Sequence, residues 1–303
     1  MSAQLVTTLG DLTADQVGWM LAHEHIFANF YADDDADAPV APVIQRLQAE
    51  LKAVKAAGIT VLAEATAVGG ARRPDVLLAV SQAANLPFIA ATGLFKEPAK
   101  TQWTQRLGES GLRDWLIREL TEHMDGGTFR AGWIKLSVTD SGVQPHEVHL
   151  LRAAAQASQA TNAVVGSHTV GAVLANAELD IFEAAGGDPA RFIWIHTQTE
   201  PDVEQHAAFA QRGAWIEYDA IDEDRPDEAY LDFILRAFAG GYADHVLLAH
   251  DRAGYNPTQV NGGPFKPYTY LPAQFVPKLQ ARGIDEAGID QLLRANPVRA
   301  YAR

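Results

Sequence analysis

Two histidines separated by one glutamate stand at the end of an apolar stretch. They are His23 and His25 in "VGWMLAHEHIF", a stretch that is typical of a short buried strand. Alternate residues of a strand point to the same side, so both imidazoles are expected to face one way. A buried imidazole needs a partner for each ring nitrogen, or a metal ion. The spacing therefore predicts a pair of metal ligands.

Four further polar residues interrupt apolar runs at a corresponding place. They are Lys135 in "WIKLS", His168 in "GSHT", His196 in "WIHT" and Asp251 in "LAHD". Taken singly, a histidine near a strand end is usually structural, and an aspartate there is commonly a helix N-cap. A lysine inside an apolar run is unusual, because burying an unpaired ammonium is costly. Together, the six residues predict one shared site.

Imidazole and carboxylate ligands suit Zn²⁺, Co²⁺, Mn²⁺ or Fe²⁺. Six groups are too many for one catalytic metal that keeps an open position, whereas two neighbouring metals would use all of them. A lysine that burial keeps neutral beside two cations can react with CO₂. The resulting carbamate behaves like a carboxylate and can bridge the metals, which would explain the lysine at position 135.

The elements that must position these residues form a repeating pattern. Eight apolar runs alternate with amphipathic helical stretches: "VGWMLAHEHI", "ITVLAEAT", "FIAATGL", "AGWIKLSV", "AVVGSHT", "FIWIHT", "GAWIEYDA" and "HVLLAHD". This pattern predicts an α/β fold, a (β/α)₈ TIM barrel in a single domain over residues 1–303, with the metal centre at the C-terminal strand ends. A doubly wound open sheet is the alternative, but "AVGGAR" does not fit its glycine-rich phosphate turn.

Composition narrows the possible partners. The formal net charge of −14 and the absence of a basic run disfavour nucleic acid. No stretch is long and apolar enough for a membrane span, and the N-terminus lacks the features of a secretory signal, so a cytoplasmic location is expected. The lack of cysteine excludes disulfides and thiolate metal sites.

Taken in order, "HEH", "IK", "SH", "IH" and "HD" resemble the phosphotriesterase-like lactonases of the amidohydrolase superfamily. The resemblance covers roughly residues 5–303 and includes "GGDPARFIWIH" and "NPVRAYA". It implies that two histidines and the aspartate hold a buried metal, two histidines hold an exposed metal, and the carboxylated lysine bridges them. The residues concerned are His23, His25 and Asp251, then His168 and His196, and Lys135 as the bridge. Asp251 is then the proton acceptor, and a homodimer is expected.

The chain departs from the family near the substrate. Phe95 stands where lactonases of the family usually carry a tyrosine, and Ala220 where an arginine or histidine is usual. Thr199 stands where the proton relay of the phosphotriesterases has an aspartate. These differences weaken the case for an efficient organophosphate hydrolase and make a standard acyl-homoserine lactonase less certain.

Residues around the mouth of the predicted barrel are candidates for substrate binding. They are Phe95, Arg252 and Lys96. Arg252 and Lys96, together with Lys266, suggest a cationic rim for an anionic substrate; ordinary surface charge is the alternative. His250 is expected to point out of the barrel in a structural role. Surface positions are expected for His123, His146, His149, His206 and His245.

Three functions fit this sequence. The leading hypothesis is a binuclear metal hydrolase that opens a lactone ring by attack of a metal-bridging hydroxide, with promiscuous esterase or phosphotriesterase activity. The second is a phosphoric triester or other ester hydrolase with the same metals. The third is a catalytically inactive barrel that binds a ligand.

Overall fold

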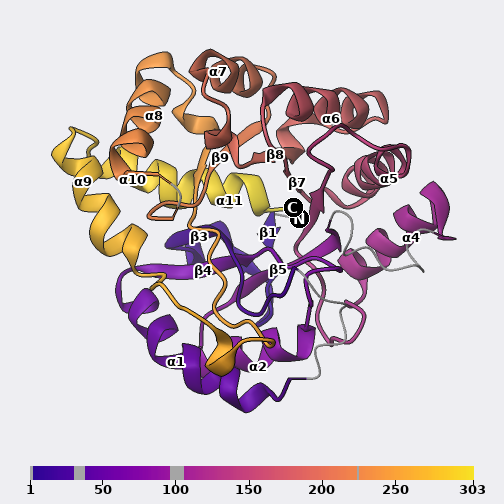
Figure 1. The fold of residues 1–303 in the computed structure, drawn as a ribbon, viewed down its shortest axis with the longest axis horizontal. Coiled ribbons are helices and arrows are strands. Elements are labelled where there is room, and N and C mark those ends of the chain that lie inside the picture. The colour runs from indigo at the N-terminus through magenta and orange to yellow at the C-terminus, as the bar shows by residue number, and fades with distance from the viewer. Residues whose placement is uncertain (1–2, 31–37, 96–105, 224) are drawn as a thin grey trace.

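A ring of parallel strands surrounded by helices makes up the computed structural model of the protein (Figure 1). The structure describes residues 3–30, 38–95, 106–223 and 225–303. Among these residues, eight parallel strands lie side by side in chain order. They are β3 (Trp19–Glu24), β4 (Ile59–Glu64), β5 (Phe88–Leu94), β6 (Trp133–Ser137), β7 (Val165–His168), β8 (Phe192–Ile195), β9 (Trp215–Tyr218) and β10 (Val246–Leu248). The (β/α)₈ barrel is confirmed, and the doubly wound alternative is wrong.

Helices connect successive strands on the outside of the ring. They are α1 (Val40–Ala56), α2 (Pro74–Ala84), α4 (Gly108–Thr121), α5 (Pro145–Thr161), α6 (Ala172–Ala184), α7 (Val203–Gln211) and α8 (Asp227–Gly240), followed by α9 (Val276–Ala281), α10 (Glu286–Asp290) and α11 (Asn296–Tyr301). Several end at a left-handed residue, such as Asn162 after α5 and Gly241 after α8, as helix C-termini commonly do. No helix in the described ranges is long and apolar enough to cross a membrane.

Strand alternation decides which side chains reach the interior. On β6, Ile134 and Leu136 pack in the layer between the strands and helices, whereas Trp133 packs inside the barrel. Lys135 therefore points inward as well. The neighbouring strand comes so close that a Cβ at Gly93 would lie 2.0 Å from the Lys135 carbonyl oxygen. Gly93 also has φ +115°, so glycine is required beside the lysine.

The end of the barrel opposite the site is closed by side chains and by the chain ends. The Tyr301 hydroxyl donates to the Ala22 carbonyl oxygen at 2.7 Å, and its ring meets the Trp133 ring edge-on at 5.3 Å between centroids. Near this end, Gln4 and Arg303 exchange two backbone hydrogen bonds of 3.1 and 3.0 Å. The short antiparallel pair β1 (Gln4–Leu5) and β2 (Leu12–Thr13) precedes the barrel.

Candidate metal centre

The barrel closes where the first strand, β3, meets the segment that follows the last strand, β10. The Asp251 amide donates to the His23 carbonyl oxygen at 3.2 Å, and the His25 amide donates to the Arg252 carbonyl oxygen at 2.8 Å. The carboxylate of Asp251 consequently lies between two imidazoles. Its Oδ1 is 3.2 Å from Nε2 of His23 and 3.0 Å from Nε2 of His25.

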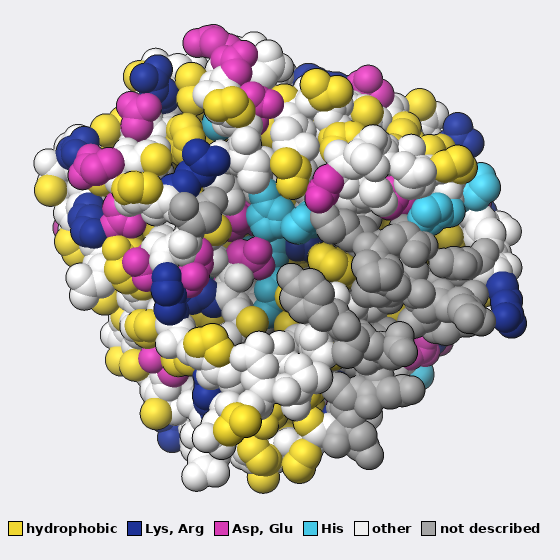
Figure 2. Space-filling model, viewed as in Figure 1, with side chains coloured by type: hydrophobic (Ala, Val, Ile, Leu, Met, Phe, Trp, Pro, Cys, Tyr) yellow, Lys and Arg dark blue, Asp and Glu magenta, His cyan; other side chains and the backbone are white. Residues whose placement is uncertain are grey.

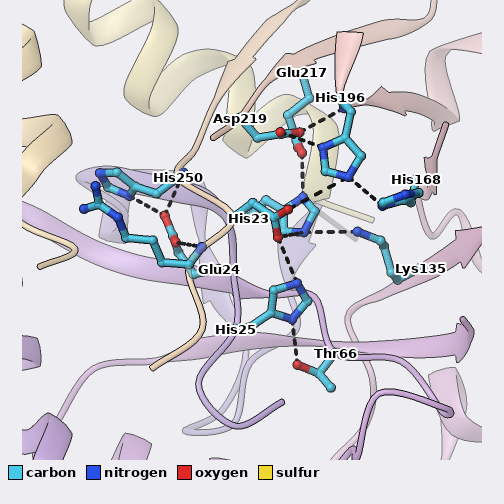
Figure 3. Close-up of polar contacts among 12 residues, drawn as sticks. His23, Glu24, His25, Thr66, Lys135, His168, His196, Glu217, Asp219 and His250 are labelled. Carbon is cyan, nitrogen blue, oxygen red and sulfur yellow. Dashed lines mark hydrogen bonds and ion pairs between the residues drawn. The ribbon is translucent and has the colours of Figure 1, made fainter. Parts of the chain in front are cut away.

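The other three predicted ligands reach the same point from β6, β7 and the end of β8 (Figure 3). Lys135 Nζ lies 3.0 Å from His23 Nε2. His196 Nε2 lies 2.6 Å from His168 Nδ1 and 3.9 Å from Asp251 Oδ2. The structure therefore places all six residues that the sequence singled out around one centre.

The outward nitrogens of three histidines are each occupied by a buried acceptor. Nδ1 of His23 lies 2.6 Å from Glu217, and Nδ1 of His196 lies 2.6 Å from Asp219. Nδ1 of His25 lies 2.7 Å from the Thr66 hydroxyl, which itself donates to Glu64 at 2.5 Å. Acceptors at these nitrogens fix the tautomer, because each Nδ1 must carry the proton.

This proton assignment has a direct consequence for the inward nitrogens. A neutral imidazole with hydrogen on Nδ1 presents a lone pair at Nε2. In this neutral form, the lone pairs of His23 and His25 point at Oδ1 of Asp251, and that of His196 points towards Nδ1 of His168 at 2.6 Å. A cation at the centre would stabilise this arrangement. The sets His23–His25–Asp251 and His196–Asp219–Asp251 each have ligand atoms within 4.8 Å of one another. The residues present therefore fit metal ions of the Zn²⁺, Co²⁺, Mn²⁺ and Fe²⁺ type.

Burial changes the acid–base properties of this region. Desolvation lowers the pKa of the Lys135 ammonium below its usual value of 10.5, although nearby carboxylates oppose this shift. A neutral amine is the form that reacts with CO₂. Desolvation also raises the pKa of Glu64 to about 7. A cation at the centre would favour the ionised form of this carboxylate.

Glu24, the middle residue of the histidine motif, has a role that sequence reasoning missed. Its carboxylate faces away from the centre and accepts hydrogen bonds from the amides of His250 and Arg252 at 3.1 and 3.0 Å. It also accepts from Nδ1 of His250 at 2.5 Å. These bonds fix both neighbours of Asp251, which itself has the unusual φ of +56°. The predicted structural role of His250 is confirmed, since its Nε2 accepts from the Leu271 amide at 2.9 Å.

Glu217 and Asp219 were also missed, although a signal was present. They alternate in "WIEYDA" in the same way that the two histidines alternate in "HEH", so both point inward. His206 was predicted to lie at the surface, and this is wrong. It is fully buried, with Nδ1 2.9 Å from the Tyr218 hydroxyl and Nε2 3.0 Å from the Glu200 carbonyl oxygen.

The residues predicted for substrate binding behave differently from one another. The Phe95 ring lies edge-on to His168 at 5.8 Å between centroids, close to the centre. Arg252 is only 4% exposed and is paired with Asp222 and Glu223. This pairing argues against the free cationic rim, because the charge of Arg252 is already compensated. Lys96 lies outside the described residues.

Thr199, which replaces the relay aspartate, is committed to the backbone. Its hydroxyl donates to the His196 carbonyl oxygen at 2.7 Å and accepts from the Gly171 amide at 3.2 Å. Ala220 has φ +55° and lines a cavity beside Asp251. Figure 2 shows histidine side chains in a hollow near the middle of this face, with acidic and basic side chains beside it.

Comparisons with known proteins agree with this geometry. The chain matches the phosphotriesterase family over residues 3–301. A phosphotriesterase homology protein of Escherichia coli is 23% identical over 96% of this chain and 100% of its own length. N-acetyltaurine hydrolase of Tetraodon nigroviridis is 26% identical over 98% of this chain and 97% of its own length.

Two solved structures extend the comparison to the fold. A mutant PTE-like lactonase of Deinococcus radiodurans matches with a TM-score of 0.86 and 27% identity, covering 98% of this chain and 99% of that one. A triple mutant of organophosphorus hydrolase from the same organism matches with a TM-score of 0.89 and 27% identity, covering 99% and 97%. Because the match spans nearly its whole length, the chain belongs to the phosphotriesterase family, and it is a hydrolase.

Proposed function

We propose that this protein is a binuclear metal-dependent hydrolase that opens lactone rings. One observation carries the proposal: the Nε2 atoms of three buried histidines lie 3.0 to 3.9 Å from the carboxylate oxygens of Asp251. Imidazole and carboxylate groups gathered in this way are the ligands that Zn²⁺, Co²⁺, Mn²⁺ and Fe²⁺ prefer. The similarity to a PTE-like lactonase over 98% of the chain supports a lactone as the substrate.

The ligands divide into two groups around Lys135. His23, His25 and Asp251 would hold one ion, and His168 with His196 the other. Lys135 would bridge them after its neutral Nζ forms a C–N bond with CO₂ and releases a proton, which gives an anionic carbamate. Two bound ions would polarise the substrate carbonyl and lower the pKa of a bound water, so that a nucleophile exists at neutral pH.

The remaining chemistry belongs to side chains of this protein. Asp251 would accept the proton that the attacking water gives up and deliver it to the ring oxygen as the C–O bond breaks. Glu24 would hold Asp251 in position through the flanking amides. Glu217 and Asp219 would keep their histidines oriented, as carboxylates behind metal-binding histidines commonly do. Phe95 would form an apolar wall next to His168.

Two other substrate classes remain as alternatives on the same centre. The likeness to organophosphorus hydrolase favours a phosphotriester, although Thr199 is bound to the backbone and Ala220 offers no polar group. The likeness to N-acetyltaurine hydrolase favours an N-acyl amide. Each of the three classes places a carbonyl or phosphoryl oxygen at the centre, so they differ mainly in the shape and charge of the surrounding cavity.

The test combines metal content with a substrate panel. The protein is expressed with Zn²⁺, Co²⁺ or Mn²⁺ in the medium, and bound metal is measured by mass spectrometry. We expect about two metal ions per chain. We also expect kcat/KM on γ- and δ-lactones to be at least about tenfold above that on an aryl phosphotriester or an N-acetylated aminosulfonate. A higher kcat/KM on the phosphotriester or on the N-acetyl amide would indicate that class as the substrate. Absence of both metal and turnover would leave a ligand-binding barrel.

For the intact protein in its cellular setting, we propose a single domain over residues 1–303, a homodimer and a cytoplasmic location. Its partner would be a small lactone or ester, and neither nucleic acid nor a membrane. Light scattering of the metal-loaded protein tests the dimer directly.

A further inference from the structure

A cavity of about 460 Å³ opens beside Asp251, between the segments that follow β9 and β10. This volume lies within the range of about 300–1,000 Å³ that is usual for small-molecule sites. Its apolar lining consists of Ala220, Ala253, Pro264 and Phe265, and its polar lining includes Glu223, Arg252 and Lys266. A substrate that reacts at Asp251 would therefore extend part of its structure into this cavity.

The guanidinium of Arg252, which lines the cavity, is already hydrogen-bonded to other groups of the protein. Its Nε donates to Glu223 at 2.7 Å, and Nη2 donates to Asp222 at 2.8 Å. Its Nη1 donates to the carbonyl oxygen of Pro267. With 4% of its surface exposed, the guanidinium binds the protein itself and has little surface to offer an incoming anion.

Lys266 is compensated by the same acids. Its Nζ lies 3.1 Å from Glu223 Oε2 and 3.9 Å from Asp222 Oδ2. We call Asp222, Glu223, Arg252 and Lys266 the mouth cluster. Its two carboxylates and two cations sum to a formal charge of zero. An anionic substituent would have to displace Glu223 from its cations, within a chain whose net charge is −14.

We infer that Glu223 in the mouth cluster disfavours a substrate arm that carries a negative charge, so that the cavity discriminates between lactones by the charge of that arm. The inference rests on the proposed function and names its substrate class. Apolar contact with Phe265 and Pro264 favours a hydrocarbon arm. The carboxylate of Glu223 already takes the place that the carboxylate of a substrate would need.

The experiment uses two lactones with the same ring. One carries an alkyl arm, and the other an arm of equal length that ends in a carboxylate. For the metal-loaded wild type, we expect kcat/KM to favour the alkyl lactone by about tenfold or more. Glu223→Gln frees Arg252 and Lys266, so the ratio should move about fivefold or more towards the carboxylate lactone, mainly through a lower KM.

Glu183→Gln is the matched control. Glu183 is ion-paired with Arg212 at the end of α6, so this variant changes the net charge equally but lies outside the mouth. Its ratio should equal that of the wild type. Lys266→Met is a second variant at a side chain that is 48% exposed, and folding should tolerate it. It removes one cation, so the ratio should move further away from the carboxylate lactone.

The outcomes separate this inference from the proposed function. A wild-type preference for the carboxylate lactone overturns the inference, and so does an equal change in Glu223→Gln and Glu183→Gln. An unchanged ratio in Lys266→Met also contradicts it. Turnover of both lactones without charge preference removes the inference but leaves a lactonase. Turnover of neither lactone by the fully metallated protein removes the proposed function, and this inference with it.

Discussion

The strand-end centre and the mouth cluster both gather charged or metal-ligating groups around Asp251, but they treat charge in opposite ways. In the mouth cluster, each cation has a carboxylate within 3.1 Å. At the strand ends, the carboxylate of Asp251 faces the Nε2 atoms of three histidines at 3.0 to 3.9 Å. The comparison shows that charged side chains that neutralise one another need no further partner. A buried set of groups whose charges do not balance requires a bound ion or ligand. The variants described below test this difference.

The largest effect is expected for Lys135→Met. Methionine fills the space of lysine but cannot form the carbamate, so the bridge between the two ions is lost. We expect kcat to fall by about 10³-fold or more, together with the loss of at least one metal ion by mass spectrometry. Full activity with two bound ions would show that Lys135 does not bridge.

A companion variant tests the same residue by rescue. Lys135→Ala leaves a hole next to His23, and a short carboxylic acid in the buffer can occupy it. Activity and metal content should rise together with the concentration of acetate or propionate. A neutral amide of equal size should not restore either quantity.

Glu24→Gln should have the next largest effect. The amide group of glutamine accepts at only one atom, so the amides of His250 and Arg252 can no longer both be satisfied, and Asp251 loses its position. We expect kcat to fall by about 10²-fold with a smaller change in KM, and metal affinity to fall by about 10- to 100-fold.

Glu147→Gln is the matched control for this variant. Glu147 is also fully buried and accepts three hydrogen bonds, from the Thr139 amide and hydroxyl and from the Gln144 amide. It should lose similar stability while keeping metal affinity. If the two variants lose metal affinity equally, Glu24 has only a general structural role.

Arg252→Met tests the mouth cluster and should have a smaller effect. Without the guanidinium, Asp222 and Glu223 lose the group that joins the segments after β9 and β10. We expect KM to rise by about tenfold for a neutral lactone and by more for an anionic one, because Glu223 also loses a compensating charge, with two metal ions still bound. A rise confined to anionic lactones would instead support the cationic rim.

Glu178→Gln tests buried charge away from the centre, and activity should stay unchanged. Desolvation raises the pKa of Glu178 to about 8, so the folded protein retains a proton that the unfolded chain loses near its usual value of about 4.5. Wild-type stability is therefore lost as pH rises from about 4.5 to 8, by up to ~1.4 kcal/mol per pH unit. Glutamine cannot titrate. In urea unfolding at pH 5.5, 6.5 and 7.5, the free energy of unfolding of Glu178→Gln relative to wild type should increase with pH. A difference that does not change with pH would contradict the raised pKa of Glu178.

The sequence predicted the barrel and the convergence of six residues because both depend on local patterns. Apolar runs of strand length mark the strands, and a polar residue at the end of each run marks the mouth. The role of Glu24 could not be read in this way. It depends on contact between β3 and the segment after β10, which are 226 residues apart where Glu24 meets His250.

The positions of Glu217, Asp219 and His206 could have been predicted from the sequence. Glu217 and Asp219 alternate within "WIEYDA", a run whose apolar residues predict a strand but whose acidic residues also indicate inward-facing carboxylates. His206 belongs to the buried stripe of α7 with Phe209 and Ala210, a spacing of three and four residues that marks the inner face of a helix. The compensation of Arg252 by Asp222 and Glu223 depends on how two loops meet, and loop geometry leaves little trace in a sequence.

The tripeptide from His23 to His25 has a consequence for protein engineering. The side chains of His23 and His25 face the centre, and Glu24 holds the residues on either side of Asp251. A library that randomises any of the three would therefore disturb the geometry around Asp251. Ala220, Pro264 and Phe265 line the cavity next to this centre. Directed evolution towards new substrates should therefore leave the tripeptide intact and vary the cavity wall.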